Sequence, residues 1–379
     1  MSWTHTGYAQ RIHFGPGALD RVGEVCAGLR MRRVLVVTTA GRRASDAGRR
    51  LVEVLEAAVE VVSVFDGARS HVPAEVVAAA VQRRQGVRAD GVVSFGGGSC
   101  ADLAKAVCDV GEGTFAEGPA AADEEVPART YADGPALPHV SVPTTYSGAE
   151  LTPFYGMTDA DGRKRGSSGP TLAPRAAVYD PVVTLGTPVR VSAETGMNAL
   201  AHGVECAYAP TRTPEAEAIA LACIGRIAGA LPAVVDDPYD LAARTVMLEG
   251  AVLGGRCLQN AGMGVHHGLS QLLGGRTGLS HGLVNALILP HAMAFNHDAV
   301  GDAARRIGAA LGDPDDPAGA LARLRARVGL PATLAECGVT AEDVDAVASV
   351  SPENGNVANN VRPVSVADAR AILTAALEG

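Results

Sequence analysis

Short apolar runs rich in β-branched residues alternate with longer segments of mixed character through the first half of this 379-residue chain. The short runs are typical of buried strands, and the segments between them carry apolar residues at helical spacing. Such alternation predicts a parallel sheet covered by helices. The expected strands are 32–39, 59–65, 90–99 and 139–145, and the expected helices are 46–58, 73–86 and 101–109.

The pattern changes near Ser192, beyond which long Ala- and Leu-rich segments replace the strand signals. The second half is therefore expected to be all helical. A domain boundary within residues 182–190 gives an α/β domain over residues 1–185 and an all-helical domain over residues 186–379. Residues 110–136 are rich in Gly, Ala, Pro and acidic residues and are expected to form a surface loop or insertion.

Two long spans, 257–275 and 277–297, contain no Asp, Glu, Lys or Arg. Their Gly, His, Asn, Gln and Pro content favours buried helices of a soluble protein over membrane helices. The composition, 47% hydrophobic and 19% charged, is that of a globular protein, and a net charge of −9 gives no reason to expect nucleic acid or an acidic membrane as partner. Seven scattered cysteines and an N-terminus without a signal-like apolar run predict reduced thiols and a cytoplasmic location.

The clearest signal for a phosphate ligand is "VVSFGGGSCADLAKAV" (92–107), an apolar run that ends in three glycines before a helical segment. Glycines let the backbone approach a pyrophosphate, and the N-terminus of a helix offers free N–H groups. The stretch is neither a GxGxxG fingerprint nor a GK[ST] loop, so a plain tight connection is the alternative. A second run, residues 142–154, ends in small hydroxyl residues that would contact cofactor or substrate, or simply cap a helix.

The end of the first expected strand bears on the choice of cofactor. A carboxylate that reads the ribose hydroxyls normally stands there. This chain has Thr39 instead, followed by Arg42 and Arg43. A missing carboxylate and nearby arginines favour a 2′-phosphate, so NADPH is the preferred expectation and NADH the alternative. The two arginines are equally consistent with a plain surface position.

Several histidines in the second half stand among apolar or small residues, where a lone histidine is most often a satisfied core residue. Segment 192–208 is expected to be a helix capped by Ser192, and Asn198 and His202 share one face because they are four residues apart. Residues of the later stretch 264–282 complete a polar cluster. Its members are Asn198, His202, His267 and His281, with His266 beside them. An Asp at position 198 would suit a divalent transition metal, whereas an amide supplies no charge and is a poor ligand.

Taken together, these motifs resemble the iron-containing alcohol dehydrogenase superfamily, and within it they are most similar to the maleylacetate reductases. The resemblance rests on "FGGGSCADLAKAV", "VPTTYSGAELTPFYGMTD", "GMNALAHGVE" and "HHGLSQLLGGRTGLSHGLVNALILPHAMAFN". It implies an α/β dinucleotide-binding domain joined to an all-helical domain, with the active site in the cleft between them, and a homodimer.

The same resemblance assigns residues to a nicotinamide cofactor. Its pyrophosphate would lie against the glycine turn, and two threonines would lie along the rest of the cofactor. The candidates are Gly96, Gly97, Gly98 and Ser99 for the pyrophosphate, Thr144 and Thr145 along the cofactor, and Thr39 and Asp102 as further contacts.

The resemblance also bears on metal binding. In metal-dependent members an Asp and three His bind the ion, and the corresponding positions here are Asn198, His202, His267 and His281. Maleylacetate reductases are similar in carrying Asn at the first position and in working without a metal. Because an amide in place of a carboxylate removes one negative charge from the site, no tightly bound iron or zinc is expected.

The implied reaction is the reduction of maleylacetate to 3-oxoadipate by hydride from NADPH or NADH, which belongs to aromatic compound catabolism. His202 and His267 are the first candidates for stabilising the developing enolate and supplying a proton, and the rest of the histidine cluster supports them. The candidates for binding the substrate are Lys164 and Arg165, which would hold a carboxylate, and Tyr146. A solvated basic turn explains the two charges equally well.

Two positions depart from the family pattern. Gln271, retained as a candidate site residue, stands where the family usually has a proton-relaying His, and Gly268 stands where maleylacetate reductases commonly have a Lys. Glutamine forms hydrogen bonds but cannot act as a general acid near neutral pH. Three alternatives therefore stay open: a reductase of a different unsaturated or carbonyl compound in a biosynthetic pathway, a metal-dependent alcohol dehydrogenase, and a cofactor-binding relative without catalysis.

Overall fold

The structure, a computed structural model, describes residues 7–109, 137–159 and 164–379, with Lys164 described by its backbone alone. The loop expected at 110–136 lies outside the described residues. The described chain forms two compact units. One is an α/β unit made of residues from 7–145 and 149–186, and the other is a helical unit made of residues 146–148 and 187–379, so neither is one continuous piece of chain.

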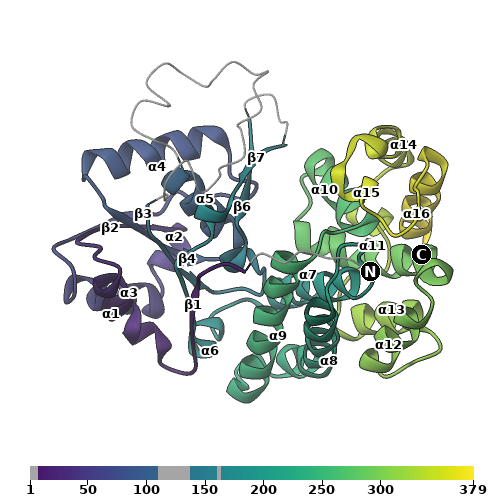
Figure 1. Ribbon diagram of the computed structural model, residues 1–379, viewed down its shortest axis with the longest axis horizontal. Helices are drawn as coiled ribbons and strands as arrows, with labels where there is room; N and C mark the ends of the chain where they lie inside the picture. Colours follow the sequence, from purple (N-terminus) through teal and green to yellow (C-terminus); the bar gives the residue numbers. More distant parts are fainter. Residues whose placement is uncertain (1–6, 110–136, 160–163) are drawn as a thin grey trace. The chain divides into compact units, whose positions relative to one another are not determined.

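The α/β unit is built on a six-stranded sheet in which all neighbouring strands are parallel (Figure 1), as the strand–helix alternation predicts. In spatial order the strands are β1 (Arg11–Phe14), β8 (Ala176–Tyr179), β5 (His139–Pro143), β4 (Gly91–Gly96), β2 (Arg33–Thr38) and β3 (Val61–Phe65). The sequence pattern predicts β2 to β5 but not β1 or β8.

Helices and a small hairpin complete this unit. The helices are α1 (Val22–Gly28), α2 (Ala40–Arg43), α3 (Asp46–Glu56), α4 (Ala74–Gly86), α5 (Gly98–Asp109) and α6 (Pro181–Thr184), and the antiparallel hairpin is β6 (Phe154–Thr158) and β7 (Lys164–Ser168). Short 3-10 turns are η1 (Ala18–Arg21), η3 (Ala149–Leu151) and η4 (Pro170–Leu172).

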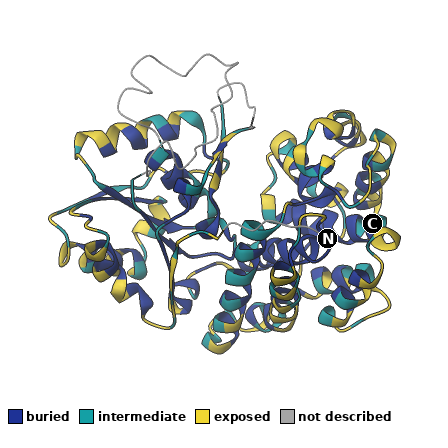
Figure 2. Ribbon diagram, in the orientation of Figure 1, coloured by how far each residue is buried: buried dark blue, intermediate teal, exposed yellow. Residues whose placement is uncertain are grey.

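Alternate residues of the central strands face opposite layers of helices. Leu35 and Val37 of β2 pack with α4 and α5, whereas Val34 and Val36 of the same strand pack with α1 and α3. A strand covered on both faces is expected to be apolar at every position. Figure 2 shows these central strands buried throughout. This two-sided burial explains why β2 and β4 read as unbroken apolar runs in the sequence.

The order of the strands identifies one point at the edge of the sheet as a candidate ligand-binding site. From β2 the chain moves to β3 on one side and then to β4 and β5 on the other. Such a reversal opens a crevice at the carboxyl ends of the two strands, where open α/β sheets bind ligands. Thr39 follows β2 and Gly97 follows β4 at this point, and the Thr38 hydroxyl donates to the Phe95 carbonyl over 2.7 Å. The topology therefore brings the ends of β2 and β4 together.

The helical unit contains the second half of the chain. Its helices are α7 (Val189–Tyr208), α8 (Pro214–Asp236), α9 (Leu241–Asn260), α10 (Val265–Thr277), α11 (His281–Val300), α12 (Asp302–Leu311), α13 (Pro317–Arg327), α14 (Ala341–Val350), α15 (Gly355–Ala358) and α16 (Val366–Glu378), with 3-10 turns η5 (Ala335–Cys337) and η6 (Ser351–Glu353). Residues 187–379 contain no strand, which confirms the all-helical prediction.

Helix α7 is buried along almost its whole length, against α8, α9 and α11. Glycines permit the close approach of its neighbours. A Cβ added to Gly196 would lie 2.7 Å from Leu231 Cδ1, and one added to Gly203 would lie 3.1 Å from Ile224 Cγ1. A helix buried on all sides cannot be amphipathic, so its polar residues must find partners inside the protein.

The prediction that Ser192 caps this helix is wrong. The helix begins at Val189, directly after Pro188, and Ser192 lies in its first turns. The Ser192 hydroxyl instead accepts a hydrogen bond from Arg244 Nη1 over 2.7 Å. A proline with extended ψ ends the preceding segment here, which a search for polar caps does not detect.

Helix α8 is long and apolar enough to cross a membrane by length and composition alone. Its packing accounts for that composition, because Ile224, Ile227 and Leu231 are fully buried against the neighbouring helices of the unit. The charged residues Glu217 and Arg226 lie on the same helix and form ion pairs within the unit. One face of α8 therefore belongs to the core of the helical unit.

Candidate functional site

The histidines expected to cluster do so in the helical unit. His202 lies in the middle of α7, His266 and His267 lie in the first turn of α10, and His281 is the first residue of α11. Ring centroids are 4.9 Å apart for His202 and His267, 4.8 Å for His266 and His267, and 6.1 Å for His267 and His281. His267 is therefore the centre of the cluster.

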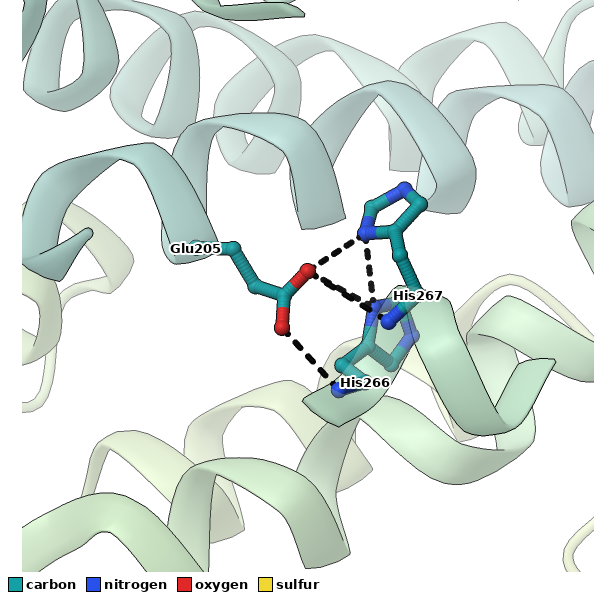
Figure 3. A group of neighbouring side chains, drawn as sticks. All are labelled: Glu205, His266 and His267. Carbon is teal, nitrogen blue, oxygen red and sulfur yellow. Dashed lines mark hydrogen bonds and ion pairs between the residues drawn. The ribbon is translucent and has the colours of Figure 1, made fainter. Parts of the chain in front are cut away.

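A carboxylate that the sequence analysis did not single out holds this centre in place. Glu205 lies on α7, three residues after His202, and is fully buried. One of its oxygens accepts from the backbone N–H of His266 over 3.0 Å, and the other lies 2.6 Å from His267 Nδ1 (Figure 3). The available signal was a lone acid three residues from a candidate histidine, in a stretch with no Lys or Arg between Arg190 and Arg212.

The same carboxylate caps helix α10. The first N–H groups of a helix have no partner within it, and the residue before α10 is Gly264, which has no side chain to accept them. Glu205 and the Asn360 side chain, which accepts from the Val265 N–H over 3.3 Å, take that role. A Cβ at Gly264 would lie 2.9 Å from both acceptor oxygens. Glycine at this position therefore allows two polar side chains to reach the start of α10.

Burial and hydrogen bonding set the charges in this group. Burial would raise the pKa of Glu205, but hydrogen bonds from the two histidines outweigh it and hold that pKa well below its usual range. Burial lowers the pKa of His267, and Glu205 only partly opposes this. Burial and the neighbouring histidines lower the pKa of His202. Glu205 is therefore ionised at neutral pH, while His202 and His267 are uncharged.

Asn198, the fourth expected member of the cluster, is held by another amide. Its Oδ1 accepts from Asn285 Nδ2 over 2.6 Å, and its own Nδ2 lies 3.5 Å from the Ser147 carbonyl. Both asparagines are buried. The pair fixes the Asn198 carbonyl oxygen as an acceptor that is already in use.

Because the resemblance implies metal-dependent relatives with an acid at the first of these positions, the fit of an ion to this cluster matters. The four positions Asn198, His202, His267 and His281 supply no negative charge. The nearby donor atoms of Glu205, His266 and His267 lie within 4.8 Å of one another, but both Glu205 oxygens are engaged with N–H groups. A set with an amide at position 198 binds a dication less tightly than one with a carboxylate there, although three imidazoles can themselves bind zinc.

Two buried nitrogens of the cluster suit a polar ligand instead. Among the described residues, His202 Nδ1 and His267 Nε2 have no hydrogen-bond partner, although both atoms are shielded from solvent. Buried polar atoms are almost always satisfied in native proteins, so an unsatisfied pair calls for an explanation. A substrate oxygen or an ordered water would supply the missing partner.

Gln271 and Gly268 lie next to this cluster on α10. Gln271 is one turn beyond His267, and its Oε1 accepts from Asn356 Nδ2 of α15 over 3.0 Å. A Cβ at Gly268 would lie only 2.5 Å from Val357 Cγ2. The short helix α15 is thus packed directly on α10 beside His267.

The expected pyrophosphate turn lies at the switch point of the sheet. Gly96 ends β4 with φ +155°, and a Cβ there would lie 2.4 Å from Cys100 Sγ. A Cβ at Gly97 would lie 3.1 Å from Thr145 Oγ1. Gly98 and Ser99 open helix α5, whose free N–H groups face the same end of the sheet. The turn is therefore bare of side chains where a phosphate would need to approach the backbone.

The other expected cofactor residues surround this turn or interact locally. Thr144 donates its backbone N–H to the Gly96 carbonyl over 2.9 Å, and Thr145 is buried. Asp102 forms an ion pair with the fully buried Lys105 over 3.0 Å. Thr39 caps the short helix α2 by accepting from the Arg42 N–H.

The arginines that favour a 2′-phosphate have partners within the α/β unit. Arg43 pairs with Asp66 over 2.8 Å, and Arg42 Nη1 donates to the Gly186 carbonyl over 3.3 Å. Hydrogen bonding to Arg43 lowers the pKa of Asp66, so this pair is ionised.

The expected substrate-binding residues lie in different places. Tyr146 is fully buried in the helical unit and bonds Arg244 Nη1 through its hydroxyl over 3.0 Å. Arg165 of β7 pairs with Asp159 over 3.1 Å. Lys164 begins β7, and its side chain lies outside the described part of the chain.

Comparisons with known proteins identify the family of this chain. The family model described as "Iron-containing alcohol dehydrogenase" matches residues 9–181, and that described as "Fe-containing alcohol dehydrogenase family, C-terminal" matches residues 192–377. Maleylacetate reductase of Pseudomonas knackmussii is 36% identical over 351 residues, which cover 93% of this chain and 91% of the relative. Maleylacetate reductase of Rhizobium sp. strain MTP-10005 is 36% identical over 379 residues, which cover 100% and 98%.

Solved structures show the same fold. The crystal structure of maleylacetate reductase from Agrobacterium tumefaciens matches with a TM-score of 0.85 at 33% identity, covering 100% of this chain and 99% of that one. A 1,3-propanediol oxidoreductase matches with a TM-score of 0.91 at 28% identity, covering 99% and 100%. The chain belongs to the iron-containing alcohol dehydrogenase family and is an NAD(P)H-dependent oxidoreductase similar to the maleylacetate reductases.

Proposed function

We propose that this chain reduces maleylacetate with NADPH or NADH and does so without a metal ion. The observation that carries the proposal is the Asn198–Asn285 amide pair, because position 198 supplies a neutral amide in place of a carboxylate and its oxygen is already held by Asn285. The identity of about 35% to several maleylacetate reductases supports the choice of substrate.

The nicotinamide cofactor, when bound, supplies a hydride. The glycine turn at Gly96–Gly98 and the N-terminus of α5 would hold its pyrophosphate through backbone N–H groups. Thr39 in place of a carboxylate would leave room for a 2′-phosphate, and NADPH is therefore the preferred form. Arg42 and Arg43 would have to exchange their present partners to contact that phosphate.

The histidine cluster would serve the substrate. Reduction of a C=C bond conjugated with a carbonyl places negative charge on the carbonyl oxygen and then requires a proton at the neighbouring carbon. His267 has an unsatisfied nitrogen at the centre of the cluster and is the proposed proton donor, with His202 beside it. Arg165 and Lys164 are the proposed contacts for a substrate carboxylate.

The proposal is tested by measuring NADPH and NADH oxidation with maleylacetate on protein of known metal content. We expect turnover that survives exhaustive chelation and does not rise on addition of Fe²⁺ or Zn²⁺. Stoichiometric iron or zinc that is required for turnover would overturn the metal-independent part. No turnover with maleylacetate, by contrast, would overturn the substrate assignment.

A second candidate function is reduction of a different unsaturated or carbonyl compound. The contacts of α10 with α15 favour it, because Gly268 and the Gln271–Asn356 hydrogen bond shape the surroundings of His267 without a lysine or a further histidine. Turnover of a panel of 2-enoic keto acids, aldehydes and ketones under identical conditions separates the two functions. A kcat/KM at least about tenfold higher for another compound would favour this second candidate.

A further inference from the structure

Hydrogen bonds in the cluster determine where its protons lie. A backbone carbonyl can only accept, and His266 Nε2 lies 2.9 Å from the Asn285 carbonyl, so this nitrogen carries a proton. The ionised Glu205 carboxylate also only accepts, and it lies 2.6 Å from His267 Nδ1, so that nitrogen carries a proton as well.

A third contact is consistent only with this assignment. His266 Nδ1 and His267 Nδ1 lie 3.2 Å apart, so only one of these two facing nitrogens can bear a proton. Because His267 Nδ1 is protonated toward Glu205, His266 Nδ1 is unprotonated and shares that same hydrogen at longer range. With this placement both Glu205 oxygens, both backbone N–H groups, His266 Nε2 and His267 Nδ1 have partners.

The remaining nitrogen is His267 Nε2, which is buried and has no hydrogen-bond partner within the part of the chain that the structure describes. We propose that Glu205 is a positioning residue that keeps His267 protonated at Nδ1, so that Nε2 alone exchanges a proton with the substrate. The inference rests on the proposed function, because it assumes that His267 delivers the proton of the reduction.

At neutral pH the ring of His267 is uncharged, so Nε2 first takes a proton from solvent, and the Glu205 carboxylate stabilises the resulting charge. His267 then carries hydrogen on both nitrogens. As a hydride with its two electrons adds to one carbon of the substrate double bond, the π electrons move to the neighbouring carbon and its carbonyl. That carbon takes the proton from His267 Nε2, which regains its lone pair, and solvent reprotonates the ring. The Nδ1 proton stays with Glu205 throughout, as an orienting carboxylate does beside a catalytic histidine.

The decisive variant is Glu205→Gln. Its amide oxygen can still accept from the His266 N–H and preserve the cap of α10. Its NH₂ group would face His267 Nδ1 and force that nitrogen to accept, which moves the ring proton to Nε2. Donation from this neutral ring would leave an imidazolate, and no carboxylate would remain to stabilise the doubly protonated ring that acts as the acid. We expect kcat to fall by about 10²-fold or more, as for loss of a general acid, while KM changes by less than about threefold. Cofactor affinity should be unchanged.

A spectroscopic readout separates positioning from mere capping. In ¹⁵N-histidine-labelled protein at pH 7.5, His267 is identified by comparison with His267→Asn, and its two nitrogen shifts report which one is protonated. We expect a protonated Nδ1 in the unaltered protein and a protonated Nε2 in Glu205→Gln. Glu205→Asp, which keeps the charge, should retain the Nδ1 proton and recover part of kcat.

Glu217→Gln is the matched control, because Glu217 is a partly buried carboxylate of α8 that pairs with Arg212 and Arg306 away from the histidines. It should alter stability without changing kcat or the His267 spectrum. The proposal is overturned if the unaltered protein carries the His267 proton on Nε2, or if Glu205→Gln retains kcat within about threefold. If Glu205→Gln does not fold, the spectrum of the unaltered protein and the kcat of Glu205→Asp still decide it.

The spectrum needs no substrate, so it is independent of the proposed function. If maleylacetate is not turned over but the spectrum shows a protonated Nδ1, the substrate is rejected and the role of Glu205 is supported. The kcat of the variants is then measured with the compound that the unaltered protein does reduce. Turnover of maleylacetate together with a protonated Nε2 would support the substrate and reject the role of Glu205.

Discussion

His267 is the residue on which the proposed chemistry depends most directly. Replacing it with alanine removes the unsatisfied nitrogen at the centre of the cluster, so we expect kcat to fall by about 10²- to 10⁴-fold. NADPH binding, followed by fluorescence titration, should be retained because the glycine turn is untouched. His297→Ala is the control, since His297 is half exposed at the end of α11 and outside the cluster. An unchanged kcat in His267→Ala would refute its role.

Asn198 determines whether the cluster can hold a dication. Asn198→Asp would add one negative charge beside three imidazoles and could still accept from Asn285 Nδ2. We expect Zn²⁺ affinity of chelator-treated protein, measured by titration calorimetry, to rise by more than about tenfold, because a carboxylate is a far better ligand than an amide.

The control for this measurement is Asn260→Asp, which adds the same charge at the end of α9. Equal Zn²⁺ affinity in the two variants would show that the missing charge at position 198 does not limit metal binding.

At the scale of single residues, the sequence predicted which histidines cluster but not the hydrogen bonds that hold them in place. The spacing of Asn198 and His202 and the isolation of His267 in apolar sequence were sufficient to bring them together. Glu205 was missed because its importance arises from contact with the N-terminus of α10, about sixty residues away in the chain. The Asn285 partner was missed for the same reason, since hydrogen bonds between distant helices leave no periodic signal.

At the scale of elements, α10 and α15 form a close contact that glycine makes possible. Gly268→Ala would place a Cβ 2.5 Å from Val357 Cγ2 and 2.9 Å from Asn354 Oδ1. Because Asn354 caps α15 and Val357 is buried, neither can move freely. We expect a loss of about 1–3 kcal/mol in the free energy of unfolding, measured with urea.

Gly275→Ala on the same helix is the control, because a Cβ there meets nothing within 4 Å. It should leave stability unchanged or raise it by up to about 1 kcal/mol through helix propensity. An equal free energy of unfolding in the two variants would show that α10 and α15 are not in close contact at Gly268.

Strand prediction succeeded mainly where burial on both faces produced long apolar runs, and it failed for β1 and β8. Strands β2, β4 and β5 are such runs, whereas β3 is a partly buried edge strand that its β-branched residues predict. The sequence of β8, "AAVY", is rich in alanine, which is unfavourable in strands, and its place between β1 and β5 comes from tertiary pairing. The edge strand β1, "RIHF", alternates polar and apolar residues but is only four residues long, which is too short for the alternation to predict a strand.

For the molecule as a whole, buried titratable groups predict how stability depends on pH. The pKa values of His202 and His267 are lowered from 6.5, and that of His139 is lowered to about 3, chiefly by burial. As the pH falls below 6.5 the unfolded chain therefore binds protons that the folded protein does not, and stability decreases. Each such proton changes the free energy of unfolding by about 1.4 kcal/mol per pH unit.

Glu205 adds to this loss at lower pH. Its pKa is lowered from 4.5, so its stabilisation is complete above pH 4.5 and disappears as the pH falls toward the folded value. Urea unfolding at pH 7.5, 6.0 and 5.0 should show a decline that begins before carboxylates titrate, and His139→Asn should make it shallower. Constant stability from pH 7.5 to 5.0 would contradict the buried, uncharged histidines.

The interrupted course of the chain has a practical consequence for dissecting this enzyme. Residues 146–148 belong with the helices although both flanking segments belong to the α/β unit, and Tyr146 reaches the fully buried Arg244. A fragment starting at 187 would lack that tyrosine and leave a guanidinium in the interior short of one hydrogen bond. Limited proteolysis or truncation at 186/187 should therefore not release an independently folding half, and any split version of the protein must carry the tripeptide in trans.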